Sequence, residues 1–499
     1  MAVIGLACRY PGACDSPDKL WQFLRDGQSA ITEVPAYRWS VDDYYSPDAT
    51  APGKMRCRFG SFLGPVEDFD CQFFRMSKKE AECLDPQQRL LLELSCEAIA
   101  DAGLAKTALA GSRTGVFIGQ SGFDFAVQHT NLDSLNELTP YVGSGCSFAP
   151  AAGRIAFFHD FHGPAYVLDT ACSSSLVAVH NACRSLQNGD CDLALVGAAN
   201  LILSPAMTIN FDKLGLLAPD GRIQTFDAAA HGFVRGEGAG MIILKKLPDA
   251  LRDGDRLDGL ILSSAINEDG SSNSLMSPNG LAQVDVIRQT LQGAGITPDD
   301  MDFLETHGTA TPAGDPMELN ALADVFATTT RRRPLRIGSV KTNFGHLEAG
   351  AGMLGICKLL LSMRHNALPP HLNFEHGTAE FDWSSGCLEV NRTLSPWARS
   401  DRPRIAGISG FGFAGTNAHI ILAEPPLTGS AGRPRLAAPV FDRQRCWSAA
   451  AERARLGRQS ATNLHIMQEH LRLMQQYLNL RSTNNSQASS KTDGDLYGH

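Results

Sequence analysis

The stretch Ala165–Gly197, AYVLDTACSSSLVAVHNACRSLQNGDCDLALVG, decides the fold class of this chain. Ala165–Asp169 reads as a short apolar strand, Ser173–Gln187 has the spacing of a helix, and Asp192–Gly197 reads as a second apolar strand. Buried strands that alternate with helices are typical of α/β proteins. This stretch therefore predicts an α/β fold.

The same alternation continues on both sides of this stretch, over residues 2–425. We expect further strands at Ala2–Ala7, Gly115–Gln120, Gly238–Leu244, Leu257–Ser264, Phe303–Thr306, Ile337–Val340, Ile405–Ile408 and Ala418–Leu422. We expect further helices at Asp18–Arg25, Lys78–Asp101, Gln283–Ala294 and Leu347–Met363. The region therefore reads as one long globular region of alternating strands and helices.

Composition excludes several classes of protein. Hydrophobic residues make up 43% of the 499 residues, which is enough to bury a large core. A net charge of −9 is a poor match for general nucleic-acid binding. The most apolar run, Met353–Met363, contains Lys358 and falls short of the roughly 18 residues of a membrane span. The 13 scattered cysteines include no CxxC pair, which favours reduced thiols in a cytoplasmic enzyme.

The texture of the sequence changes after Glu424. Prolines, glycines and arginines predict a linker at 426–460. An amphipathic helix is predicted at 461–480, where one apolar stripe contains Leu464, Met467, Leu471, Met474 and Leu478. Since a lone helix would leave this stripe in water, we interpret it as an interaction element, with a frayed remnant as the alternative. The polar tail 481–499 is expected to be disordered.

Cys172 is the first candidate for chemistry. It lies in DTACSSSL, Asp169–Leu176, where the predicted strand ends and the predicted helix begins. The positive end of a helix dipole can lower the pKa of a thiol and favour a nucleophilic thiolate. The alternative is a buried structural cysteine, which is common for this residue type.

Two histidines follow strands in the same manner. His307 comes after the strand at Phe303–Thr306, and His346 precedes the helix predicted from Leu347. A helix N-terminus disfavours imidazolium, so His346 is expected to be neutral and to donate a hydrogen bond. Lys341 and Glu348 are expected to pair nearby. Ordinary structural histidines and a surface lysine are the alternatives.

The glycine-rich stretch Gly407–His419 lets backbone N–H groups approach a ligand closely, unless it is only a tight turn between strands. The GxGxxG match at Gly350–Gly355 lies inside a predicted helix, so it favours helix packing over dinucleotide binding. One cysteine with two neutral imidazoles suits acyl transfer and enolate stabilisation. This set favours carbon–carbon bond formation over hydrolysis by a cysteine hydrolase, which needs only one histidine.

At these residues the sequence resembles the ketosynthases (beta-ketoacyl synthases) of the modular type I polyketide synthase family. The family motif DTACSSSL is unaltered here, and HGTGTxxGDPxE is matched at His307–Glu318 with Ala310 in place of a glycine. VKxNxGHxEAxAG is matched at Val340–Gly352, and FGxxGTNAH is matched at Phe411–His419. Further stretches that resemble the family are Asp85–Glu93, Phe226–Gly240, with His231 in place of an aspartate, and Phe441–Trp447.

The resemblance implies a ketosynthase domain at 1–425 with the thiolase-like fold, in which two similar halves, roughly 1–255 and 256–425, form five α-β-α-β-α layers. It implies that Cys172 accepts an acyl chain, while His307 and His346 assist decarboxylation of a malonyl-type extender. Lys341 would hold the charge network with Glu348. Backbone N–H groups of Cys172 and Phe413 would form the oxyanion hole, and Phe413 would act as a gate. The supporting residues would be Thr309, Thr311 and Asp315.

The resemblance also implies partners. No cofactor and no metal is expected on this chain, because substrates would arrive on the phosphopantetheine of a separate acyl carrier protein. No acyltransferase motif is present, so an acyltransferase acting in trans is expected, together with a homodimer. A non-elongating or scaffolding ketosynthase that only transfers or gates acyl chains is the alternative.

Overall fold

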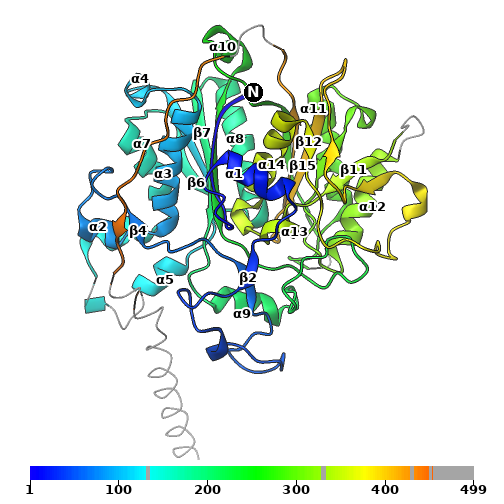
Figure 1. Cartoon of the computed structure of the whole chain (residues 1–499), viewed down its shortest axis with the longest axis horizontal. Coiled ribbons are helices and arrows are strands. Elements are labelled where there is room, and N and C mark those ends of the chain that lie inside the picture. The colour runs from blue at the N-terminus through cyan, green and yellow to red at the C-terminus, as the bar shows by residue number, and fades with distance from the viewer. Residues whose placement is uncertain are drawn as a thin grey trace, which may run out of the picture. The chain divides into compact units, whose positions relative to one another are not determined.

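One sheet of eleven strands runs through the unit Met1–Trp447 (Figure 1). The computed structural model describes residues 1–130, 135–136, 138–272, 274–327, 333–427, 432–448 and 452. The helix predicted at 461–480 and the tail at 481–499 lie outside the described residues, as do parts of the linker predicted at 426–460.

The sheet consists of two half-sheets that meet at a short junction. The first half has, in spatial order, β6 (Ala165–Leu168), β5 (Thr114–Gly119), β7 (Leu193–Asn200), β8 (Gly238–Lys245) and β1 (Ala2–Arg9). The second half has β9 (Gly259–Glu268), β16 (Thr416–Ala423), β15 (Ile405–Phe411), β10 (Phe303–Glu305), β11 (Leu335–Gly338) and β13 (Leu388–Val390). The halves join where Ala2 pairs with Leu260 and Val3 pairs with Gly259.

Alternation of side chains along the strands separates the layers. On β5, Val116 and Ile118 pack into an outer apolar cluster, whereas Phe117 points into the central one. On β16, Ile420 faces the central cluster and Ile421 faces a third. Because successive strand residues point to opposite faces, each half-sheet is covered by apolar contacts on both sides.

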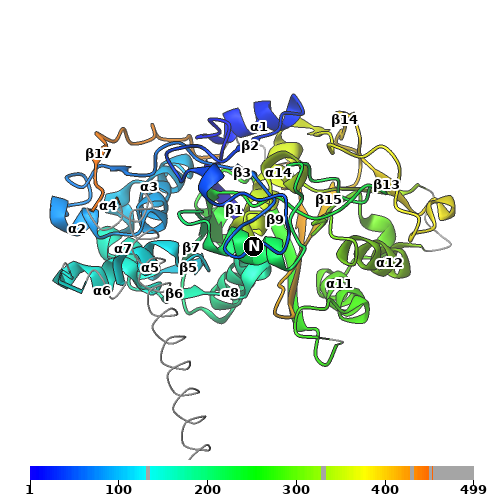
Figure 2. The same ribbon diagram turned by 90° about the horizontal axis from the view of Figure 1, so that it is seen from below.

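Helices fill the outer and central layers (Figure 2). The central layer holds α8 (Ser174–Asn188) and α14 (Ala351–His365), which contact strands of both halves. The outer helices pack mainly on one half: α3 (Pro86–Asp101) and α7 (Pro150–His159) on the first, and α11 (Gly280–Ala294), with α12 (Gly314–Phe326) packed on it, on the second. The predicted α/β fold with five α-β-α-β-α layers is confirmed.

Two predicted helices are interrupted in the structure, and the helix predicted at Gln283–Ala294 begins three residues earlier, at Gly280. The helix expected at Lys78–Asp101 is broken into α2 (Lys78–Glu82) and α3, because Pro86 has no backbone N–H to donate to the preceding turn. Asp85 caps the second helix by accepting from the Gln87 N–H at 2.8 Å. The helix expected from Leu347 begins at Ala351, after α13 (Lys341–Phe344) and a 3-10 turn at Glu348–Gly350.

Helix α14 is a core helix. All of its residues from Ala351 to Met363 are buried, including Lys358. A side chain at Gly352 would place its Cβ 2.6 Å from Cγ of Leu176 on α8, so the GxGxxG match serves helix packing. Across the described residues, no helix combines the length and hydropathy that crossing a membrane requires.

Residues 432–447, which fall in the predicted linker, pack on the unit. β17 (Gln444–Arg445) pairs with β4 (Asp68–Phe69). Arg89 of α3 donates to the Cys446 carbonyl at 2.7 Å, and Arg443 forms a two-pronged pair with Glu93. This part of the chain is therefore held by specific contacts.

Candidate active site

Cys172 lies in a tight turn between β6 and α8. The turn is a 3-10 segment, Ala171–Ser173, in which Ala171 has a φ of 54°. Asp169 accepts from the Ala171 N–H at 2.8 Å, and Ser174 accepts from the Thr170 N–H at 2.9 Å. These short side chains provide hydrogen-bond acceptors for the backbone N–H groups of the turn, and Cys172 lines a cavity that is described below.

His307 follows the end of β10. The Glu318 carboxylate of α12 accepts from the backbone N–H groups of His307 and Gly308, each at 2.7 Å. On the ring, Nδ1 accepts from the Phe411 N–H at 3.3 Å. Because Nδ1 is an acceptor, the proton of the neutral ring lies on Nε2.

His346 lies against the thiol. Its Nε2 is 3.2 Å from Sγ of Cys172, and its Nδ1 accepts from the Glu348 N–H at 3.0 Å. This ring also carries its proton on Nε2 when neutral. The two imidazoles lie 5.8 Å apart between centroids at 85°. The structure thus brings Cys172, His307 and His346 together, each from a different strand end.

Both histidines are neutral for the same physical reason. Burial lowers the pKa of His307 and His346 well below the usual value, and the positive charge of Lys341 lowers both further. The prediction of a neutral His346 is confirmed, but the cause assigned to it is wrong. The ring lies between α13 and a 3-10 turn, so burial acts in place of a helix N-terminus.

The thiol pKa differs from the prediction. The pKa of Cys172 is raised to about 11, chiefly by burial and secondly by the carboxylate of Glu348. Lys341 and the backbone N–H groups of Phe413 and Cys172 oppose the rise by stabilising the thiolate. The expectation of a lowered pKa is wrong because burial, which disfavours the thiolate, is the largest influence on this group.

This raised pKa predicts how the thiol reacts. Between about pH 7 and pH 9, the alkylation rate of Cys172 by iodoacetamide should rise about tenfold per pH unit, because only the thiolate reacts. Peptide mass spectrometry after timed quenching gives the rate. A rate that is flat above neutral pH would mean that the thiol is already ionised there.

Lys341 and Glu348 have separate partners. The Lys341 ammonium donates to the His307 carbonyl oxygen. Glu348 pairs with Arg235 at 2.6 Å, and Arg235 also donates to Thr208 at 2.9 Å. The expected Lys341–Glu348 pair is therefore wrong. Arg235 was missed as a site residue, although it stands in the matched stretch Phe226–Gly240.

A cavity of about 160 Å³ opens onto these groups. Phe413 is 47% exposed and lines the cavity beside Cys172. The backbone N–H groups of Phe413 and Cys172 both lower the pKa of the thiol by stabilising the thiolate. Two N–H groups beside one developing negative charge are the arrangement that stabilises an oxyanion. The lining also includes Phe211, Phe233, Met276, Pro278, Thr309 and Thr311.

Of the three remaining predicted residues, Thr309 and Thr311 lie in the turn after His307 and Asp315 lies in the first turn of α12. The hydroxyls of Thr309 and Thr311 lie 3.2 Å apart and line the cavity. Asp315 accepts from the N–H groups of Ala310 at 2.9 Å and Phe226 at 2.6 Å. The Asp315 carboxylate therefore fixes the backbone of the turn after His307 without lining the cavity among its described residues. Burial raises its pKa to about 8.

Ala310 occupies a backbone conformation that favours glycine, with a φ of 57°, and its methyl group is buried. Ala310→Gly should relieve about 1 kcal/mol of backbone strain and lose about 0.8 kcal/mol of methyl burial. We expect the free energy of unfolding to change by less than about 1 kcal/mol, because these effects nearly cancel. Urea denaturation measures it. A loss of several kcal/mol would show that the methyl group is essential to the turn.

Comparison with known proteins agrees with this geometry. Residues 1–250 match the family model "Beta-ketoacyl synthase, N-terminal domain", and residues 259–375 match "Beta-ketoacyl synthase, C-terminal domain". A curated relative, a phenolphthiocerol/phthiocerol polyketide synthase of Mycobacterium tuberculosis, is 44% identical over 428 residues. The match covers 85% of this chain and 20% of that protein, so the chain spans about a fifth of such relatives.

Solved structures give the same result. The ketosynthase from module 6 of the bacillaene synthase of Bacillus subtilis is 40% identical, with a TM-score of 0.79 over 85% of this chain and 72% of that one. An oxazolomycin ketosynthase domain of Streptomyces albus is 39% identical, with a TM-score of 0.81 over 86% and 75%. This chain therefore belongs to the beta-ketoacyl synthase family, among the ketosynthases of modular polyketide synthases.

Proposed function

We propose that this chain catalyses the decarboxylative Claisen condensation of an acyl-Cys172 thioester with a malonyl-type extender on an acyl carrier protein. One observation carries the proposal. Both imidazoles beside the thiol accept a backbone N–H at Nδ1, so both present Nε2–H as a donor. Two fixed donors suit an enolate oxygen, whereas hydrolysis needs a base.

In the first half-reaction, the Cys172 sulfur attacks the thioester carbonyl carbon of the incoming acyl group. The oxygen becomes negative and accepts hydrogen bonds from the N–H groups of Cys172 and Phe413. The carbonyl re-forms as the phosphopantetheine sulfur departs and takes up the proton lost by Cys172. Since the raised thiol pKa leaves little thiolate at neutral pH, these donors and Lys341 must stabilise the developing charge.

In the second half-reaction, the thioester oxygen of the malonyl group accepts from Nε2–H of His307 and His346. The carboxylate leaves as carbon dioxide, and its bonding electrons form an enolate. The enolate carbon attacks the acyl carbon on Cys172, and the sulfur leaves as a thiolate that takes up a proton from solvent. The β-ketoacyl chain remains on the carrier.

Intact-mass analysis with a panel of acyl thioesters and malonyl-loaded carrier proteins tests the proposal. Acyl mass on the chain, followed by a carrier mass that corresponds to the extended β-ketoacyl product, is the expected result. Acylation without extension by any pair in the panel would favour the alternative, a non-elongating or scaffolding ketosynthase. The presence of His307 in the site argues against that alternative.

The partners are part of the proposal. Phosphopantetheine would be carried by a separate acyl carrier protein, and an acyltransferase acting in trans would load the extender. The matched relatives are polyketide synthases, which supports this assignment. The cytoplasm is the compartment in which we expect the reaction.

We also propose a homodimer that pairs through β6. This strand ends the sheet order, with no strand beyond it among the described residues. Tyr166 on β6 is exposed, and Phe157 on the adjoining α7 is 90% exposed. An open strand edge flanked by apolar side chains is a template for pairing. Sedimentation should give about twice the 53.7 kDa of one chain, and Phe157→Glu should lower that mass.

A further inference from the structure

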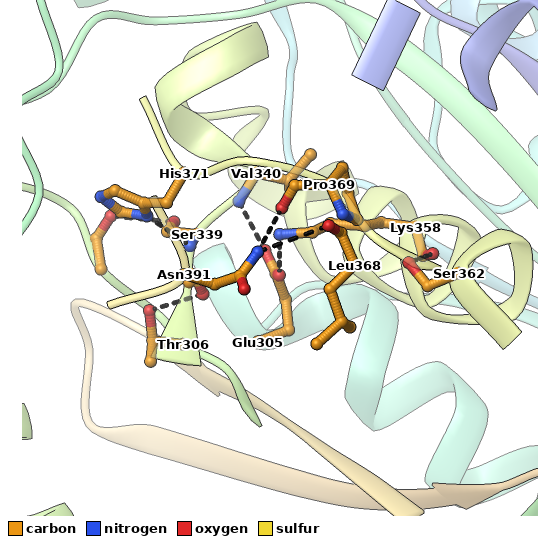
Figure 3. Close-up of polar contacts among 12 residues, drawn as sticks. Glu305, Thr306, Ser339, Val340, Lys358, Ser362, Leu368, Pro369, His371 and Asn391 are labelled. Carbon is orange, nitrogen blue, oxygen red and sulfur yellow. Dashed lines mark hydrogen bonds and ion pairs between the residues drawn. The ribbon is translucent and has the colours of Figure 1, made fainter. Parts of the chain in front are cut away.

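Lys358 is a buried lysine for which the proposed reaction has no use. It lies on the core helix α14 and is 1% exposed. Its ammonium donates to Oε2 of Glu305 at 2.6 Å, as Figure 3 shows, and the Glu305 side chain is 3% exposed. A buried ion pair is often no more stabilising than a well-packed apolar pair. Stability alone therefore does not explain why the Lys358–Glu305 ion pair is present.

The second oxygen of Glu305 supplies a reason. Oε1 accepts from the Val340 N–H at 2.5 Å (Figure 3). Val340 directly precedes Lys341, and Glu305 stands two residues before His307. One carboxylate thus ties the strand end that carries His307 to the turn that carries Lys341. Lys358 joins them to α14, the helix that follows His346.

Glu305 holds the turn before Lys341 together with two neighbouring hydrogen bonds. Before Val340, the Ser339 N–H donates to Nδ1 of His371 at 3.0 Å. Thr306 donates its hydroxyl to the Gly338 carbonyl at 3.1 Å. These contacts fix the residues just before Lys341 (Figure 3). Without an acceptor at Glu305, the buried Val340 N–H would lose its partner, which is costly.

Glu305 is also placed beside the reacting groups. Together with Cys172, His307 and Lys341 it lines a cavity of about 10 Å³ behind the thiol. Helix α14 makes room for it, because a Cβ at Gly355 would lie 3.1 Å from Cγ of Glu305. Burial lowers the pKa of Lys341, and Glu305 is the foremost of the carboxylates that oppose the fall.

We propose that Glu305 and Lys358 are positioning residues for condensation. Lys358 keeps Glu305 in place, and the Glu305 carboxylate holds the Val340 N–H so that Lys341 and His307 keep their relative positions. The inference rests on the proposed condensing function. It assigns no contact with substrate to either residue.

Two double variants separate positioning from stability. Glu305→Leu with Lys358→Met replaces the pair by apolar groups of similar size and removes the acceptor for Val340. Glu305→Gln with Lys358→Met removes the same charges but keeps an acceptor. We expect the first to lower the condensation rate by on the order of 10²-fold, as misplaced catalytic groups do, and the second to restore most of it.

Three measurements accompany each variant: the thermal midpoint, the acylation rate of Cys172 and the condensation rate. Acylation of Cys172 should fall much less than condensation does, because the backbone N–H groups of Cys172 and Phe413 remain in place even where Lys341 shifts. Glu424→Gln is the matched control. It removes one charge from the buried Arg404–Glu424 pair at the other end of β15, and should leave condensation unchanged.

Equal condensation by the two double variants would overturn the proposal, whether both are active or both inactive. If the double variants do not fold, Glu305→Asp replaces them. It keeps the charge but shortens the side chain by one methylene, and a wild-type condensation rate for it would also overturn the proposal. Failure of the proposed function is distinguishable, because the wild-type chain itself would then form no extended product.

Discussion

Cys172→Ala is expected to abolish acylation of this chain while leaving its fold intact. The thiol is the nucleophile that we propose: it lines the cavity, His346 Nε2 lies 3.2 Å from its sulfur, and the backbone N–H groups of Cys172 and Phe413 stabilise its thiolate. Removal of one sulfur atom should change the free energy of unfolding by less than about 2 kcal/mol. Intact-mass analysis after incubation with an acyl thioester measures the acylation, and circular dichroism measures the fold.

Cys183→Ala is the matched control, because Cys183 is a buried thiol on α8, the helix that follows Cys172. It should acylate at the wild-type rate. A Cys172→Ala chain that still gained the acyl mass would place the nucleophile elsewhere. The 13 cysteines of the chain make that comparison necessary, since the described ones are all free thiols.

The sequence predicted the layers of this fold well because its buried strands are short apolar runs between clear turn signals. It predicted fewer of the outer helices. Helix α12 begins inside the motif His307–Glu318, so Gly314–Glu318 were interpreted as motif residues and not as the start of a helix. Helix α7 contains Gly153 within a run of small residues, which weakens its helical pattern. A motif places residues along the chain, but the helix that it begins is determined by packing.

The site residues could be found from sequence, whereas their electrostatics could not. A motif brings Cys172, His346 and Lys341 to strand ends, yet the sign of each pKa shift depends on burial, which only the assembled layers determine. Ion pairing could not be predicted either. Glu348 was expected to pair with Lys341, but it pairs with Arg235, which precedes Lys341 by 106 residues in the sequence.

The two histidines are expected to act only after acylation. His307→Ala or His346→Ala should leave acylation of Cys172 within about tenfold of wild type, because the backbone N–H groups that stabilise its oxyanion remain. Each variant should lower condensation by about 10²–10³-fold, the cost of removing one donor to a developing oxyanion. Separate mass measurements of the acylated chain and of the extended carrier product resolve the two steps.

His231→Ala is the control for loss of an imidazole, because His231 lies in the matched stretch Phe226–Gly240 but pairs with Asp220 away from the thiol. It should leave both steps unchanged. A histidine variant that condensed near the wild-type rate would remove that residue from the enolate site. One that lost acylation as completely as Cys172→Ala would instead assign that histidine to the first step; Nε2 of His346 lies 3.2 Å from the sulfur.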